Sequence, residues 1–253
     1  MMTAVERRTS RSGVRIRYLD NAPARPAGLP VLFSPGVTDF ADEYMEVLEF
    51  FLPRRMIVVE VRGRGRSEVP SDNYSAADHA DDLAAVLDEE GIDRFHMMTF
   101  SRGTTWALDL VLRDPLRVAS VSIGDYWARE HRLDEAAADT MMATRFRGRP
   151  MPERVEAHVL TELFRASQDR DLCGHLATTG IPVLVASGTE AGGLLTDDNL
   201  DEYRHRIPDV ETAVIAGASH DLFRPDRLAY PRVVQNFIAR RAPGLRPSAT
   251  SPQ

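Results

Sequence analysis

Ser101 stands where the pattern of the chain changes abruptly. An apolar run typical of a strand ends at Phe100, and a helical pattern extends from Gly103 to Arg113. A sharp turn between a strand and a helix holds a serine hydroxyl clear of the backbone, where it can act as a nucleophile. Such turns need small residues two positions before and after the serine. Gly103 meets this need, and Thr99 takes the place of the usual glycine. Ser101 is therefore the candidate nucleophile.

His220 is the candidate base. A neutral serine hydroxyl is a poor nucleophile and needs a base within hydrogen-bond reach, and imidazole suits this task because its pKa lies near 7. The chain has seven histidines, of which His220 follows a predicted strand in the run Gly217-Ala218-Ser219-His220. His96 lies inside a predicted strand and is interpreted as a packed residue. Three further histidines are interpreted as solvated or as packing a lid: His131, His158 and His175.

Strand and helix patterns alternate along most of the chain, after a predicted pair of antiparallel strands at its start. The predicted strands are 4–9, 14–18, 29–33, 56–59, 95–100, 118–123, 182–187 and 211–215, and the predicted helices are 42–52, 76–90, 103–113, 198–206 and 231–241. This alternation predicts an α/β protein with a doubly wound, mostly parallel sheet. Ligands of such sheets bind beyond the carboxyl ends of the strands. The loops and residues expected there are 34–37, 101–102, Asp125, Glu190 and His220.

Composition and charge argue against several other classes of protein. The net charge of −7 argues against nucleic acid as a partner. Cys173 is the single cysteine, which fits a reducing compartment. The N-terminus lacks the apolar core of a signal peptide, and no run reaches the roughly 18 apolar residues of a membrane span. A soluble, cytoplasmic protein without membrane contact is expected. The run Arg62 to Ser67 is interpreted as a tight turn, and no metal cluster or dinucleotide fingerprint is found.

These segments together resemble the α/β-hydrolase family, over about residues 14–241. The matching segments are Phe33-Ser34-Pro35-Gly36 for the oxyanion loop, Glu60 to Ser67 for the D-x-R-G-x-G-x-S segment, Thr99 to Gly103 for the elbow, and Gly217 to His220 for the G-x-G-H run. The order serine, acid, histidine is also the family's order. The resemblance implies an α/β-hydrolase fold in which a serine, a histidine and an acid act together. It is unspecific about the substrate.

The resemblance leaves the acid open between two residues. The family's usual place lies about three residues after Gly188, where this chain has no aspartate, and Glu190 stands one place early. The family's other place follows the preceding strand, where Asp125 stands. Asp125 is favoured, with Glu190 as the alternative. The family's geometry assigns the two N–H donors for a tetrahedral oxyanion to the backbones of Val37 and Arg102.

The segment 128–180 is interpreted as a helical cap over the site. A crossover between parallel strands needs only about a dozen residues, so this longer segment is expected to do more than connect. Its pattern is helical without a clear strand. We expect Trp127, Met141 and Met142 to line an apolar substrate pocket beside Ser101. The predicted domains are a hydrolase core of 1–127 and 181–241, the cap, and a disordered Pro/Ser-rich tail of 242–253.

These observations favour a serine hydrolase that cleaves a small or medium apolar ester, lactone or thioester, acting as a monomer or homodimer on a small molecule. Two alternatives stay open. One is a member of this fold that performs acyl transfer, C–C bond cleavage or cofactor-free chemistry. The other is a protein that binds a ligand without turnover, against which the complete set of serine, histidine and acid counts. No cofactor and no metal are expected.

Overall fold

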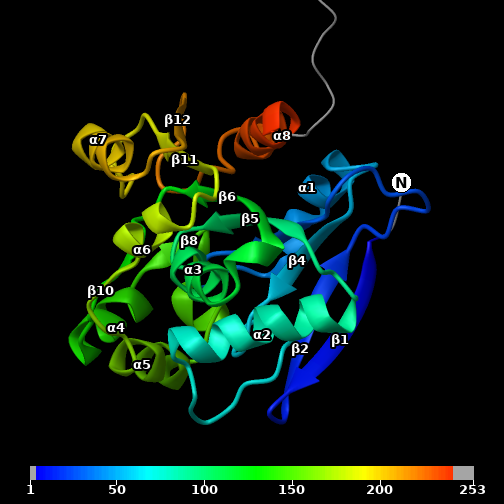
Figure 1. The fold of residues 1–253 in the computed structure, drawn as a ribbon. Coiled ribbons are helices and arrows are strands. Elements are labelled where there is room, and N and C mark those ends of the chain that lie inside the picture. The colour runs from blue at the N-terminus through cyan, green and yellow to red at the C-terminus, as the bar shows by residue number, and fades with distance from the viewer. Residues whose placement is uncertain (1–3, 242–253) are drawn as a thin grey trace, which may run out of the picture.

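The computed structural model describes residues 4–241, which are organised around one eight-stranded sheet (Figure 1). The strand order is β1-β2-β4-β3-β5-β6-β11-β12. β2 pairs antiparallel with β1 and β4, and all other neighbours are parallel. The bounds are β1 Val5–Arg11, β2 Val14–Asp20, β3 Val31–Ser34, β4 Met56–Glu60, β5 Phe95–Phe100, β6 Val118–Gly124, β11 Val183–Gly188 and β12 Val210–Ile215.

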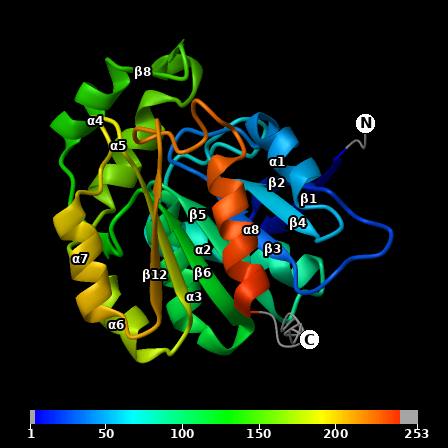
Figure 2. The same ribbon diagram turned by 90° about the horizontal axis from the view of Figure 1, so that it is seen from above.

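Helices cover both faces of this sheet. Helices α1 and α8 lie on one face and α2 and α3 on the other, and Figure 2 shows α8 lying across its face of the sheet (Figures 1 and 2). The bounds of the core helices are α1 Met45–Phe50, α2 Ala76–Glu89, α3 Gly103–Arg113, α7 Asp197–Arg206 and α8 Ala229–Arg241. Helix α2 begins with a capping box, in which Ser75 and Asp78 bond each other's backbone N–H.

The two covered faces explain why the central strands have no polar alternation. In β5, Phe95 and Met97 belong to the core against α2 and α3, whereas Met98 and Phe100 belong to the core against α1 and α8. Every residue of β5 is buried. A parallel strand with helices on both sides is apolar at consecutive positions for this reason. The α/β class and the doubly wound, mostly parallel sheet predicted from the sequence are confirmed.

The segment between β6 and β11 carries short strands as well as helices. Its elements are β7 Arg129–Glu130, α4 Glu135–Met142, β8 Arg145–Phe146, β9 Arg149–Pro150, the 3-10 turn η3 Met151–Glu153, α5 Ala157–Arg165, β10 Arg170–Asp171 and α6 Leu172–Thr178. The prediction that this segment has no strand is therefore wrong. The turn joining β8 to β9 is Arg147-Gly148, with φ of +48° and +80°. It is a two-residue hairpin turn without the Asn-Gly or Asp-Gly signal that makes such turns easy to recognise.

Other predicted bounds hold to within a few residues. The helix predicted at 42–52 begins as the 3-10 turn η1 Ala41–Tyr44 before α1. The predicted tail, 242–253, lies outside the described residues. Among residues 4–241, no helix combines the length and the apolar character that crossing a bilayer requires.

Candidate active site

Ser101 occupies the turn between β5 and α3. Its φ of +52° is the left-handed conformation, which is uncommon for residues other than glycine and clusters at functional sites. Gly103 has no room for a side chain, because an added Cβ would lie 2.1 Å from the carbonyl oxygen of Pro35. Thr99 is accommodated because its Oγ1 lies 2.8 Å from Oγ1 of Thr104, so that its polar atom is satisfied. The strand, turn and helix thus hold Ser101 as the sequence pattern predicts.

His220 lies between Ser101 and Asp125. Its Nε2 is 2.9 Å from Oγ of Ser101, and its Nδ1 is 2.8 Å from Oδ2 of Asp125. Because the carboxylate can only accept, Nδ1 carries the proton and Nε2 is left to accept the serine's O–H. The ring of Phe100 stacks on the imidazole with centroids 5.1 Å apart. The order of the three groups is therefore hydroxyl, imidazole and carboxylate, joined by two hydrogen bonds.

Asp125 directly follows β6, and its side chain is fully buried. Its backbone N–H donates to the carbonyl of Ala186 in β11, at 2.8 Å. Its carboxylate accepts two further hydrogen bonds, from the backbone N–H of Leu194 at 2.8 Å and of Leu195 at 3.1 Å. Together with Nδ1 of His220, three donors face this carboxylate. A buried carboxylate needs such donors because desolvation disfavours its charge.

Glu190, the alternative acid, is placed differently. It is exposed in the loop after β11, and its Oε1 accepts from Oγ1 of Thr189 at 3.1 Å. Among the described residues, His220 Nδ1 is hydrogen-bonded to Asp125 and not to Glu190. The structure thus brings Asp125 to the histidine and leaves Glu190 at the surface.

The loop that carries Gly36 and Val37 lines the same pocket as Ser101 and is held by hydrogen bonds. The Gly36 N–H donates to Oδ2 of Asp39 at 2.8 Å, and the carbonyl of Val37 accepts from Nε of Arg64 at 2.7 Å. Within residues 4–241, no acceptor bonds the N–H of Val37 or of Arg102. Both N–H groups are thus available as donors, and their assignment to an oxyanion remains a prediction.

A pocket of about 200 Å³ opens beside Ser101 and His220. It is lined by Gly36, Val37, Thr38, Asp39, Phe100, Ser101, Met141, Thr144, Arg145, Phe146, Met151 and His220. Of the three side chains expected to line it, Met141 does so, whereas Met142 and Trp127 are not among its lining residues. Phe146 and Met151 supply the remaining apolar wall from the segment 128–180.

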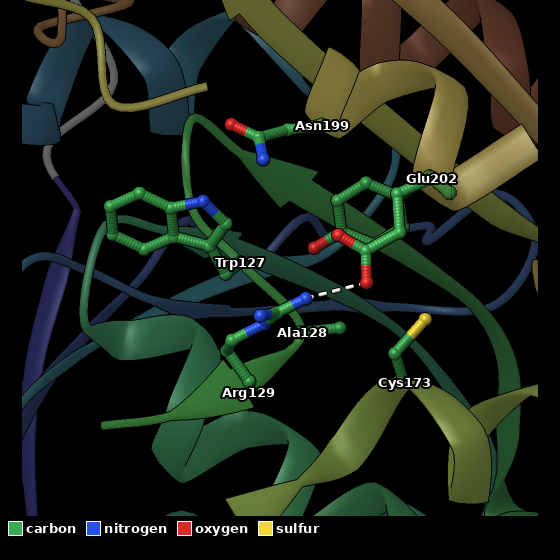
Figure 3. A pocket seen from close by; sticks show the side chains of 7 residues that line it. Trp127, Ala128, Arg129, Cys173, Asn199 and Glu202 are labelled. Atoms are coloured by element: carbon green, nitrogen blue, oxygen red, sulfur yellow. Dashed lines mark hydrogen bonds and ion pairs between the residues drawn. The ribbon is translucent and has the colours of Figure 1, made fainter. Parts of the chain in front are cut away.

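Trp127 lines a separate hollow of about 10 Å³, shown in Figure 3. Its ring packs edge-on against His131, with centroids 5.6 Å apart. The hollow also contains Arg129, whose guanidinium pairs with Glu202 at 2.5 Å, and Cys173 (Figure 3). This space is too small for a substrate. The expectation for Trp127 is corrected accordingly: its ring packs against the start of the segment 128–180.

Sequence reasoning missed Arg147, which stands at the tip of the β8–β9 hairpin. Its guanidinium is bidentate to Asp221, at 2.8 and 2.9 Å, and reaches Glu43 at 3.0 Å. Burial raises the pKa of Asp221, but the hydrogen bonds and charge of Arg147 outweigh this and hold that pKa below its usual value. Arg147 thereby ties the hairpin to the residue next to His220. Its partners lie 74 or more positions away, so no local pattern points to it.

Arg154, in the same segment, forms a second set of contacts with the core of the protein. It donates from Nε to the carbonyl of Thr38 at 3.1 Å and from Nη2 to Glu43 at 2.7 Å. Burial raises the pKa of Glu43, and the opposing hydrogen bond and charge of Arg154, with the charge of Arg147, hold it below its usual value. The pocket is thus closed by a segment that is anchored by two arginines to the loops carrying Val37 and His220.

The sequence and the fold agree with one family of proteins. The alpha/beta hydrolase fold family matches residues 30–148, which include Ser101 and Asp125. The sheet order, the strained serine turn and this match make the chain an α/β-hydrolase-fold protein. The resemblance drawn from its motifs is thereby confirmed.

Curated relatives match part of the chain. One named "Putative carbamate hydrolase RutD", from Variovorax paradoxus, is 31% identical over 131 residues, covering 51% of this chain and 48% of the relative. A second of that name, from Azorhizobium caulinodans, is 32% identical over 104 residues, covering 41% of this chain and 39% of the relative. The matched stretch thus spans about half or less of these relatives.

Solved structures match nearly the whole chain at low identity. The esterase RhEst1 from Rhodococcus sp. superimposes with a TM-score of 0.77 at 20% identity, covering 95% of this chain and all of that one. The N-acyl homoserine lactonase AidH superimposes with a TM-score of 0.76 at 17% identity, covering 96% and 99%. At such identities the likeness establishes the fold and leaves the substrate undecided.

Proposed function

We propose that the protein is a serine hydrolase that cleaves a carboxylic ester, lactone or thioester through an acyl-enzyme on Ser101. The observation that carries the proposal is the chain of two hydrogen bonds, 2.9 Å from Ser101 Oγ to His220 Nε2 and 2.8 Å from His220 Nδ1 to Asp125 Oδ2. These distances lie within the reach that nucleophile, base and orienting acid need. Asp125 takes the role of the acid, and Glu190 does not.

In the proposed reaction, Ser101 Oγ attacks the acyl carbon while His220 Nε2 takes its proton. The backbone N–H groups of Val37 and Arg102 donate to the developing oxyanion, and Asp125 stabilises the imidazolium that forms. His220 then protonates the leaving group. Water, activated by the same imidazole, releases the acid from the serine ester.

The pocket supports a small or medium acyl group with apolar character. Its volume of about 200 Å³ lies below the range typical of drug-sized ligands. Met141, Phe146 and Met151 supply apolar wall from the segment 128–180, which we propose acts as the cap. The esterase and lactonase among the structural neighbours, and the name of the curated relatives, support an acyl substrate and place a carbamate within the panel to be tested.

A fluorophosphonate probe tests the nucleophile directly. We expect one adduct on the wild-type chain, none on Ser101→Ala, and an unchanged adduct on Ser219→Ala, a serine in the same loop as His220. On the best substrate from a panel of esters, lactones, thioesters and carbamates, Ser101→Ala should lower kcat by on the order of 10⁴–10⁶. Turnover near the wild-type rate in Ser101→Ala would rule out the acyl-enzyme.

A further inference from the structure

Two of the buried arginines in the described part of the chain have no carboxylate partner. Among residues 4–241 five arginines are buried, and three of them pair with a carboxylate: Arg17 with Glu60, Arg62 with Asp82 and Arg154 with Glu43. Arg64 and Arg102 are only 1% and 5% exposed, and within residues 4–241 neither lies within ion-pair distance of an acidic group. An unpaired charge in the interior is strongly unfavourable. Both exceptions adjoin the reacting groups, because Arg102 follows Ser101 and Arg64 holds Val37.

The guanidinium of Arg102 makes no hydrogen bond within the described part of the chain. Its Nε is buried without a partner, and the group lies over the ring of Phe164 in α5, 5.5 Å from the centroid. An aromatic face attracts a cation but accepts none of its N–H groups in the way an oxygen does. Nε of Arg102 is therefore a buried donor without an acceptor.

Arg64 is partly satisfied. It donates from Nε to the carbonyl of Val37 at 2.7 Å and from Nη1 to the carbonyl of Arg62 at 2.5 Å, while Nη2 is buried without a partner. The group lies over Trp106, 5.3 Å from the ring centroid. Burial lowers the pKa of Arg64 to about 9, and the nearby charge of Arg102 adds to this effect. The guanidinium still carries its charge at neutral pH.

A third donor stands on the same side of α3. Thr105 Oγ1 is buried without a partner, and Thr105 follows Arg102 by three positions, so that the two side chains share one face of the helix. His79 offers no free acceptor, because its Nδ1 bonds the carbonyl of Ser75 and its Nε2 faces Arg64 Nη1 at 3.2 Å. Arg64, Arg102 and Thr105, here called the donor cluster, thus combine unused donors at the positive end of an 11-residue helix.

We propose that the donor cluster binds a carboxylate of the substrate, so that the substrates are acyl compounds that carry a second, ionised carboxyl group. This inference rests on the proposed acyl hydrolysis at Ser101. A carboxylate fits because its two oxygens match the planar fork of a guanidinium. Arg102 directly follows Ser101, and Arg64 bonds the carbonyl of Val37, which lines the pocket, so the donor cluster borders the site of the proposed reaction. Phe164 lies over the Arg102 guanidinium, so the proposal requires the ring of Phe164 to shift when the anion binds.

Binding is tested in full-length Ser101→Ala, which removes turnover from the measurement. Thermal unfolding is followed with increasing monomethyl glutarate, with the neutral dimethyl glutarate, and with inorganic phosphate, all at one ionic strength. We expect a saturable rise in Tm with the half-ester and none with the diester. Adding Arg102→Met should abolish the rise and Thr105→Val should weaken it, whereas Arg113→Met, at the exposed end of α3, should leave it unchanged. No rise with the half-ester, an equal rise in Arg102→Met, or a larger rise with phosphate would overturn the proposal.

The stability of the variants without ligand separates a binding role from a structural one. Arg102→Met removes an unpaired buried charge and should leave Tm unchanged or raise it. Arg62→Met leaves Asp82 buried without its partner and should lower Tm by about 10 °C. A fall in Arg102→Met as large as in Arg62→Met would show that Arg102 is structural.

Steady-state turnover of a charged and an uncharged ester provides the last test. The ratio of kcat/KM for monomethyl glutarate to that for methyl butyrate should fall by roughly 10–100-fold in Arg102→Met, the range expected for a hydrogen bond to a charged group. An unchanged ratio would overturn the carboxylate preference. Absence of turnover and of probe labelling in the wild type would instead count against the proposed hydrolysis, and the binding arm in Ser101→Ala does not depend on it.

Discussion

Two neighbouring loops at the carboxyl edge of the sheet differ in what they contribute to the candidate site. The loop after β6 provides the carboxylate, Asp125, which is fully buried and 2.8 Å from His220 Nδ1. The loop after β11, where the acid is commonly sought, leaves Glu190 exposed and instead donates the N–H groups of Leu194 and Leu195 to Asp125. One loop carries the candidate acid, and the other donates two hydrogen bonds to it.

The comparison shows that the surroundings of a carboxylate, more than its position in the sequence, decide whether it can act on a partly buried histidine. A carboxylate that stays ionised while buried needs donors on most of its lone pairs. Asp125 has them because β6 and β11 are neighbours in the sheet, which brings the two loops side by side. Glu190 is exposed and has no need of them, and a charge in water interacts weakly with a partly buried imidazole.

Replacing the acid should have the largest effect. Asp125→Asn keeps the size of the side chain but presents an amide that favours the wrong tautomer of His220. We expect kcat to fall by roughly 10⁴, as in other triads, while the far-ultraviolet circular dichroism stays that of the wild type. A loss below tenfold would show that the loop after β6 does not carry the acid.

Arg147 joins the β8–β9 hairpin to the loop of His220 through the carboxylate of Asp221, and its removal should have the next largest effect. Arg147→Met abolishes the bidentate pair with Asp221 and the contact with Glu43, so the loop that carries His220 loses its anchor. A displacement of about 1 Å at a reacting group lowers the rate by about 10²-fold, and we expect kcat to change by up to this amount. Arg149→Met, in the neighbouring strand of the hairpin, is the matched control. Equal rates in both variants would show that the anchor does not position His220.

The loop after β11, which donates hydrogen bonds to Asp125, can be strained without substituting Asp125 itself. Gly192 has a φ of +94°, which a residue with a side chain rarely adopts, whereas an added Cβ at Gly193 would lie 3.7 Å from Asp125 in ordinary contact. Gly192→Ala should therefore displace the N–H groups that hold the acid and lower kcat by about tenfold, equivalent to about 1.4 kcal/mol. Gly193→Ala should change it less. The reverse ranking would contradict a holding role for this loop.

The smallest effect is expected at Glu190. Glu190→Gln removes an exposed charge whose hydrogen bond is to the adjacent Thr189, and kcat should change by less than about threefold, within the range of surface substitutions. Steady-state kinetics of Glu190→Gln and Asp125→Asn, measured together, ranks the two variants by their loss of kcat. If Glu190→Gln were the more damaging variant, the roles of the two loops would have to be exchanged.

Local signals were enough to predict the fold and the position of Ser101. The strand before it and the helix after it, which begins at Gly103, lie within residues 95–113. The alternation of strands and helices specifies the parallel sheet. The α/β-hydrolase fold and the sheet class are confirmed, while the catalytic roles of Ser101, His220 and Asp125 stay predictions for the experiments above.

Contacts between distant segments were beyond the reach of the sequence. The choice between Asp125 and Glu190 depends on which one faces His220, a residue 95 positions from Asp125. The direction of the Trp127 ring depends on its packing against His131. Arg147 looks like any surface arginine until the hairpin places it beside Asp221. In each case the deciding quantity is a distance between segments, which no local pattern contains.

The three groups of the site arrive at different times during synthesis of the chain. Ser101 and Asp125 belong to the first 148 residues, but His220 follows β12. A nascent chain, or a fragment that ends between β6 and β12, therefore contains the proposed nucleophile and acid but lacks the proposed base. Under the proposed mechanism, labelling of Ser101 by a fluorophosphonate counts finished chains only. During refolding, labelling should therefore report the step at which the segment that follows β12 brings His220 beside Ser101.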